Sequence, residues 1–205
     1  MATSPFNPVG DARIQSDAGA SDSQSFIVHY QESPALGAVA SVLAAVTDTG
    51  VEQTISTGFT QPSPARVISA TAGGTAGDIG AIQVTINGTD ASGAVITEDL
   101  PAFTVDTPGT VTGSKAFATV TLVVIPAHDG TGATTSIGDG AALGLAFELP
   151  LNTVFPGISV FNGTREGTDP TVTVSSTVLS SNTITFNSAL DGSQVDAWYL
   201  VDGDE

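Results

Sequence analysis

Cysteine is absent from the 205-residue chain, so neither disulfide bonds nor thiolate metal sites contribute to its chemistry. Histidine is nearly as scarce, with two residues, and there is one tryptophan. Hydrolysis through a Ser–His–Asp arrangement needs a histidine placed on a serine and oriented by an acid. Neither His29 nor His128 lies in a motif such as a nucleophile elbow. The sequence therefore predicts no catalytic residues and a protein that is not an enzyme.

Basic residues are also few. The chain has 21 acidic residues but only four basic ones, Arg13, Arg66, Lys115 and Arg165, and its formal net charge is -17. Nucleic acids and anionic membranes are bound through clustered Lys and Arg, which this chain lacks. We therefore expect neither as a partner. An acidic surplus with very few lysines also suits high ionic strength, where salt screens self-repulsion, and this predicts a halophilic source. Stability that is flat or falling between dilute buffer and molar salt would contradict that expectation.

Long apolar runs are missing as well. The opening MATSPFNPVG does not combine basic residues with an apolar stretch in the manner of a secretory signal. The most apolar run, residues 35–46, is rich in alanine and shorter than the roughly 20 residues that cross a bilayer. We expect no membrane association.

Val, Ile, Thr, Ser and Gly dominate the remainder, which is typical of short strands and tight turns. The clearest pattern covers residues 66–124. Apolar residues alternate through Ile82, Val84 and Ile86, stop at the turn-rich NGTDASG, and resume at Val95. This pattern predicts a β-hairpin.

Other segments also have strand character, although 35–46 reads as either a short helix or a strand and is assigned to a strand because its neighbours are strands. The run at 115–125 is the strongest, and we predict one strand there, while 128–140 is predicted to be a turn. The remaining predicted strands are 25–30, 51–57, parts of 141–161, 172–178, 183–186 and 195–201.

These patterns together predict an all-β fold, an antiparallel β-sandwich or β-barrel-like module at residues 25–205, with a flexible N-terminal arm at 1–24. Within the module, a smaller portion at 25–60 could pack on a core at 61–205. The arm is polar with scattered prolines and glycines, which is typical of an unstructured terminus. A second interpretation is an arm that orders against a partner subunit through Phe6, Val9, Arg13 and Ile14.

Two further features are candidates for function. Trp198 and Tyr199 are adjacent in the last predicted strand, so they point to opposite faces, one into the core and the other to an edge or a subunit contact. Asp129 and Asp139 lie in the glycine-rich stretch at 128–140, but their spacing does not match a calcium loop. We predict no metal site and no cofactor.

Several stretches in chain order resemble one known family. They are Pro62-x-x-x-Arg66, VTINGTDASGAVITE, GSKAFATVTLVVIPA, TSIGDGAALGLAFEL, NGTREGT and NSALDGSQVDAWYLV. They are similar to a family of virion structural proteins of tailed viruses of bacteria and archaea, of the head decoration or cement type.

The resemblance implies a capsid decoration protein on the virion surface, which binds the lattice of the major capsid protein, stabilises the head and performs no chemistry. A homo-oligomer is implied, and a homotrimer at local three-fold positions is the simplest match to the lattice. The candidate interface residues are Phe6, Val9, Arg13, Ile14, Trp198 and Tyr199. The alternatives are a tail or baseplate component and a fibre-like host-binding protein.

Overall fold

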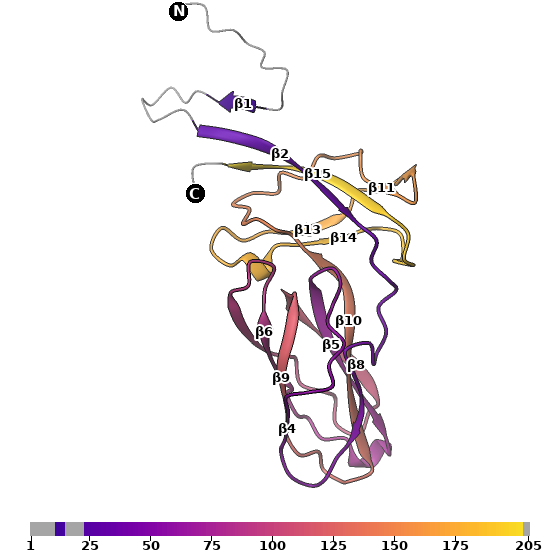
Figure 1. Cartoon of the computed structure of the whole chain (residues 1–205). Helices are drawn as coiled ribbons and strands as arrows, with labels where there is room; N and C mark the ends of the chain where they lie inside the picture. The colour runs from indigo at the N-terminus through magenta and orange to yellow at the C-terminus, as the bar shows by residue number, and fades with distance from the viewer. Residues whose placement is uncertain (1–10, 15–22, 203–205) are drawn as a thin grey trace, which may run out of the picture.

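The computed structural model describes residues 11–14 and 23–202. Over this part the chain is almost entirely β, with antiparallel pairing throughout, as the sequence predicts (Figure 1). No helix in the described residues is long and apolar enough to cross a membrane. The elements are β1 (Asp11–Ile14), β2 (Ser23–Glu32), β3 (Leu43–Thr47), β4 (Gln53–Ile55), β5 (Arg66–Gly74), the 3₁₀ turn η1 (Ala76–Asp78), β6 (Thr85–Thr89), β7 (Val95–Asp99), β8 (Gly109–Phe117), β9 (Thr119–Ile125), β10 (Ala133–Gly144), β11 (Val160–Phe161), β12 (Thr164–Arg165), β13 (Thr171–Thr173), η2 (Leu179–Ser181), β14 (Thr183–Thr185) and β15 (Val195–Asp202).

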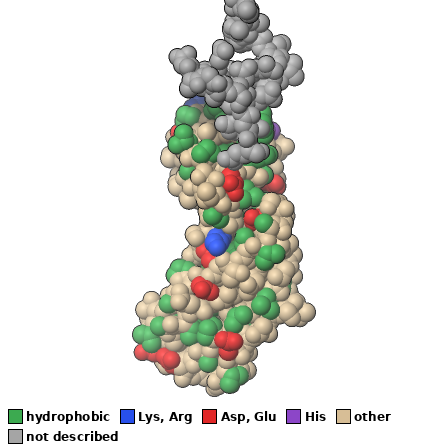
Figure 2. Space-filling model, turned by 90° about the vertical axis from the view of Figure 1, so that its left-hand side faces the viewer, with side chains coloured by type: hydrophobic (Ala, Val, Ile, Leu, Met, Phe, Trp, Pro, Cys, Tyr) green, Lys and Arg blue, Asp and Glu red, His purple; other side chains and the backbone are tan. Residues whose placement is uncertain are grey.

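The strands form three sheets, with the orders β1-β2-β15-β11-β12, β13-β14-β10-β5-β8 and β4-β9-β6-β7, and β3 also pairs with β10. The predicted hairpin is β6–β7, closed by a turn in which Asp90 accepts hydrogen bonds from Ser92 and the Ala94 amide. Figure 2 shows an elongated molecule that narrows between two parts, with acidic side chains scattered along its length.

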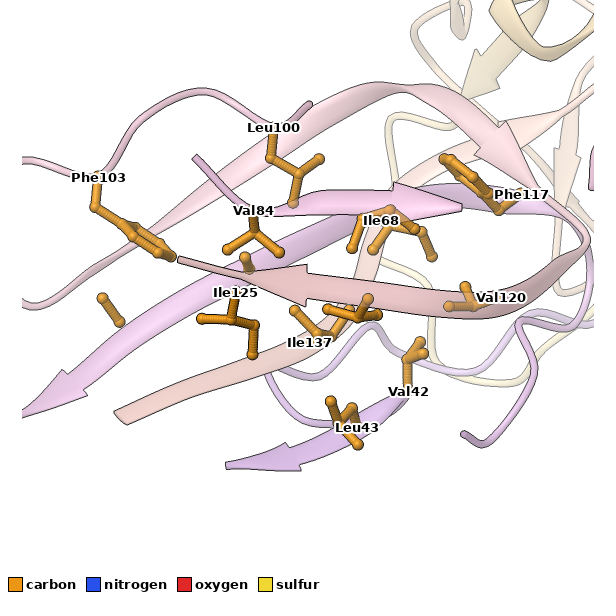
Figure 3. Close-up of a cluster of buried hydrophobic side chains, with 14 of the residues drawn as sticks. Val42, Leu43, Ile68, Val84, Leu100, Phe103, Phe117, Val120, Ile125 and Ile137 are labelled. Carbon is orange, nitrogen blue, oxygen red and sulfur yellow. The ribbon is translucent and has the colours of Figure 1, made fainter. Parts of the chain in front are cut away.

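The lower part is a β-sandwich. Strands β3, β5, β8 and β10 pack against β4, β6, β7 and β9 around one apolar cluster, which Figure 3 shows in close-up. Ile68 and Ile137 contribute from one sheet, and Ile86 and Val123 from the other, and all four are fully buried. Alternation along these strands produces the layer, because every second side chain of a strand faces the same side.

The upper part has a second apolar cluster. Here β2 and β15 pack on β13, β14 and the upper end of β10, with Tyr30, Val195 and Tyr199 against Leu143 and Ile184. Strand β2 therefore packs with residues from the C-terminal third of the chain, while β3 and β4 belong to the lower core. The predicted portion at 25–60 is thus divided between the two cores.

Strand β10 belongs to both cores, and a register shift against β5 between Asp139 and Leu143 marks the passage from one to the other. Arg66 is fully buried at this point. Its guanidinium donates through Nε and Nη2 to the Gly140 carbonyl and through Nη1 to the Ala35 carbonyl, and it lies 3.9 Å from Asp139. Arg66 thus ties the loop before β3 to the junction of the two cores.

Several predictions about strands need correction. Of the predicted strands at 35–46 and 172–178, only the parts in β3, which begins at Leu43, and in β13, which ends at Thr173, form. Residues 115–125 are not one strand, because the chain bends at Ala118 and passes from β8 in one sheet to β9 in another. The predicted turn at 128–140 ends at Gly132, and the remainder, residues 133–140, is the larger part of β10. Glycines in this part allow close packing: a Cβ on Gly138 would lie 1.9 Å from the Ala38 carbonyl oxygen. Of the strands predicted in 141–161, only the end of β10 and the short β11 form.

Within the predicted arm, residues 11–14 form β1 and pair with the first residues of β2. Arg13 and Ile14 therefore belong to an edge strand. Phe6 and Val9 lie outside the described residues.

Candidate functional site

The sheet that contains β2 and β15 has one face on the upper core and one face turned away from it. Tyr30 and Tyr199 are on the core side. The opposite side is formed by three directly paired positions, Ile27 with Leu200, His29 with Trp198 and Gln31 with Asp196. We call these six residues the outer face.

The centre of the outer face is a stack of two rings. The His29 and Trp198 rings are 4.6 Å apart between centroids and inclined by 2°. His29 Nε2 is 2.8 Å from Asp196 Oδ1, and because a carboxylate can only accept, Nε2 carries the hydrogen. The carboxylate therefore fixes the tautomer and the orientation of the imidazole against the indole.

Asp196 is buried although it lies on the outer face. Besides His29, the side-chain amides of Gln31 and Gln194 donate to its carboxylate at 2.9–3.1 Å. Burial acts to raise the pKa of Asp196, but the hydrogen bonds from Gln194, His29 and Gln31 outweigh it, and the pKa is lowered. The carboxylate is thus ionised and fully partnered.

Apolar side chains surround this polar centre. Ile27 is 49% exposed, and Trp198 and Leu200 are half-buried. Val160 of β11, also half-buried, is paired with Asp196 and continues the face across the next strand. An exposed aromatic and aliphatic area around partnered polar groups is typical of a protein-binding surface.

The His29–Asp196 pair has part of the arrangement of a catalytic triad. However, within residues 11–14 and 23–202 the His29 ring has no hydrogen-bonded serine or threonine hydroxyl. In the same residues no group of three or more His, Asp or Glu side chains could hold a metal ion.

The two acidic positions of the 128–140 stretch are far apart in the structure. Asp129 lies in the turn before β10, where its amide donates to the Asp78 carbonyl, whereas Asp139 lies beside Arg66 at the junction of the cores. His128 is buried, accepts a hydrogen bond from the Gly80 amide at Nδ1 and lies 2.8 Å from Thr135 through Nε2. His128 and Asp129 thus connect the turn before β10 to the segment around Asp78 and Gly80.

Sequence reasoning identified Trp198 and Tyr199 and the opposite orientation of their side chains, and the structure confirms it: Tyr199 is fully buried and Trp198 faces outward. It gave His29 no part in a site and missed Asp196 and Gln31, since Asp196 is 167 residues from His29. The alternation of Asp196, Trp198 and Leu200 is the one signal that could have grouped them.

A cleft of about 250 Å³ lies on the core side of the same sheet. It is lined by residues 28–32 of β2, by Tyr199, and by Pro64, Ala65, Ala91, Gly144 and Ala146. The hydroxyls of Tyr30 and Tyr199 are both buried. Burial raises the pKa of both phenols, that of Tyr199 to about 12, so both are neutral hydroxyls.

Fold and site together define an antiparallel β protein with two cores that share one strand and with an aromatic face on its upper sheet. No protein-family model, no curated protein and no solved structure matches the chain.

Proposed function

We propose that the chain is a capsid decoration protein, which binds the lattice of the major capsid protein of a tailed virus and stabilises the head. The observation that carries the proposal is the outer face, where Trp198 is stacked on His29 and flanked by Ile27 and Leu200 on a regular sheet. Tryptophan is enriched among the residues that dominate binding energy, particularly where neighbouring groups hold it rigidly.

The charge of the outer face is compatible with docking. Although the chain has a formal net charge of -17, the carboxylate on this face is Asp196, which already has hydrogen bonds from His29, Gln31 and Gln194. A partner that covers the face does not have to bury an unpartnered charge, which is the costly case. The remaining acidic side chains disfavour contacts elsewhere with anionic surfaces.

The many copies of the binding site on a capsid would increase the overall affinity beyond that of a single contact. A capsid repeats the same site many times, so a homotrimer at a local three-fold position would engage several sites at once. A trimer would then bind the capsid tightly even though each outer face contributes only a modest affinity. The acidic composition suits a halophilic host, where high salt screens the repulsion between copies.

The test compares two matched substitutions of exposed β-branched residues. Ile27→Asp puts a charge on the outer face, whereas Val51→Asp puts it in the turn between β3 and β4, where Val51 is 64% exposed. Loss of a central interface contact costs about 2 kcal/mol or more, which is a roughly 30-fold weaker affinity. We expect that loss for Ile27→Asp and no change for Val51→Asp, measured by co-sedimentation with capsids purified without the protein.

Electron cryo-microscopy of virions locates the protein directly. We expect density on the capsid surface with the β2–β15 sheet against the major capsid protein. Density on the tail or baseplate, or equal binding by both variants, would refute the proposal. Undecorated capsids should also lose their genome at a lower temperature than decorated ones.

A further inference from the structure

The sheet that carries the outer face extends past the ring stack onto β11 and β12. Val160 of β11 opposes Asp196 of β15 on one side and Arg165 of β12 on the other, and Asp196 opposes Gln31 of β2. Directly opposed residues of an antiparallel pair point to the same face of the sheet. The row that runs through Gln31, Asp196 and Val160 therefore ends at Arg165, on the same side of the sheet as the outer face.

Burial along β11 and β12 agrees with this orientation. Phe161, the neighbour of Val160, packs against the upper core. Ser159 and Glu166, which flank the Val160–Arg165 pair, are buried, whereas Arg165 is exposed. Because side chains alternate along a strand, the buried Glu166 places Arg165 on the side away from the core.

A two-residue turn fixes the position of Arg165. Asn162 and Gly163 connect β11 to β12, and their φ angles are 48° and 72°. Positive φ at both central residues is the requirement of a type I′ turn, which an Asn-Gly pair forms readily and which suits the twist of antiparallel strands. The Asn162 amide also donates to the Gln194 carbonyl at 2.8 Å, next to the start of β15. Backbone pairing thus sets where Arg165 lies relative to Asp196.

The Arg165 side chain is packed closely against Gly157. A Cβ added to Gly157 would lie 2.6 Å from Arg165 Nη2, and the φ of Gly157 is +69°, so a larger residue would displace the guanidinium. The Gly157 amide donates to the Asp169 carboxylate, which holds this loop in place. No carboxylate of the described residues lies within 4.0 Å of the Arg165 nitrogens. The guanidinium is therefore positioned but has no ion-pair partner in this part of the chain.

A positive group on this side of the sheet is unusual for a chain with a formal net charge of -17. The other basic side chains in residues 23–202 lie elsewhere: Arg66 is buried at the junction of the cores, and Lys115 donates to the Thr97 carbonyl in the lower part. Within the row, the carboxylate of Asp196 already has its hydrogen-bond partners. The row thus offers a cation at one end and no unpartnered anion.

We propose that Arg165 binds an Asp or Glu side chain of the major capsid protein when the outer face docks on it. This inference rests on the proposed function and adds the chemistry of the partner. A guanidinium donates two parallel hydrogen bonds to a carboxylate, which makes the pair specific as well as strong. Two steps between adjacent strands separate Arg165 from Asp196, so the partner's carboxylate lies about 10 Å from the group that covers Asp196.

A single guanidinium selects a carboxylate over other anionic partners. Nucleic acids and anionic lipid surfaces are held by clusters of Lys and Arg, and Arg165 is the one such side chain that residues 23–202 place on this side of the sheet. A partner that covers Arg165 also removes it from water. That loss of hydration is costly unless the partner supplies an anion in return.

The first test compares the loss of one positive charge at two places. Arg165→Gln and Lys115→Gln each change the formal net charge from -17 to -18. In co-sedimentation at constant salt with capsids purified without the protein, we expect Arg165→Gln to bind at least about tenfold more weakly and Lys115→Gln to bind as the wild type does. Arg165→Lys should fall between, because an ammonium group cannot donate as a planar fork. Equal binding by the two glutamine variants would overturn the proposal.

Carbodiimide cross-linking identifies the group that position 165 meets. The reagent joins an amine to a carboxylate as an amide and takes up the oxygen that leaves the carboxylate, so Arg165→Lys makes the position reactive. With capsids at saturating concentration, we expect a cross-link from position 165 to an Asp or Glu of the major capsid protein, found by peptide mass mapping, and none from Lys115. A bound variant that gives no such cross-link, or one only to a second copy of this chain, would overturn the inference while the proposed function stands. A wild-type chain that does not bind capsids would refute the proposed function itself.

Discussion

Replacing Arg66 by methionine tests whether the junction of the two cores depends on one buried guanidinium. The side chain of Arg66 is 1% exposed, and its nitrogens donate to the carbonyls of Gly140 and Ala35. Methionine fills much of the same volume but leaves both carbonyls without a donor and Asp139 without its nearest cation. The change therefore isolates the polar contacts from the packing.

The expected loss follows from the contacts. Hydrogen bonds to a charged group contribute about 1.5–3 kcal/mol each, and removing one partner of a buried charged pair costs about 3–5 kcal/mol. The Asp139 contact is long at 3.9 Å, so the carbonyl bonds dominate. We expect Arg66→Met to lower the free energy of unfolding by about 3–5 kcal/mol, a large part of the roughly 5–15 kcal/mol of a typical domain.

The measurement is urea unfolding followed by circular dichroism at constant salt. Arg66→Lys should fall between wild type and Arg66→Met, because one ammonium group cannot reproduce the fork that bonds Gly140 and Ala35. The control is Lys115→Ala, which removes an exposed bond from Nζ to the Thr97 carbonyl at 2.8 Å and should cost less than about 1 kcal/mol. A loss below about 1 kcal/mol for Arg66→Met would refute the assignment.

Two more predictions concern the lower core. Burial lowers the pKa of His128 against the opposing effect of Asp48 and Asp129, so between that lowered value and about 6.5 the unfolded chain binds more protons. Unfolding free energy should therefore fall as the pH drops below about 6.5, and His128→Gln should remove that part of the slope; a slope unchanged in the variant would contradict this. Gly138→Ala should cost about 3 kcal/mol or more, because its Cβ would lie 1.9 Å from the Ala38 carbonyl oxygen. Gly77→Ala, with nothing within 4 Å of the added atom, should stay within about 0.5 kcal/mol by thermal unfolding, and equal midpoints would rule out the steric argument.

The predictions that the structure confirms rested on sequence patterns within short windows. The β6–β7 hairpin was found because its turn residues and its alternation lie within a short window. Residues 133–140 of β10 were missed because their glycines read as a turn, whereas Gly138 lets the chain at Ala38 approach closely. The break at Ala118 was missed because both sides of it are equally apolar, and only the pairing partners distinguish β8 from β9.

The candidate site was even harder to predict from local sequence patterns, because its residues come from distant parts of the chain. Trp198 and Tyr199 were singled out as neighbours in the last predicted strand, and the opposite orientation of their side chains followed from strand geometry. The partners that hold Trp198 in place were not found, because His29 and Asp196 meet only when β2 pairs with β15. Tyr30 and Tyr199 come together at the cleft for the same reason, since its lining comes from distant parts of the chain.

Because the outer face requires β2 to pair with β15, it can form only after β15 has been synthesised. One half of that face lies at residues 27–31 and the other half at residues 196–200, so the ribosome must deliver β15 before His29 meets Trp198. Polypeptides that stop early therefore never display the complete face. Assembly through this surface would reject such incomplete products without any separate quality-control step.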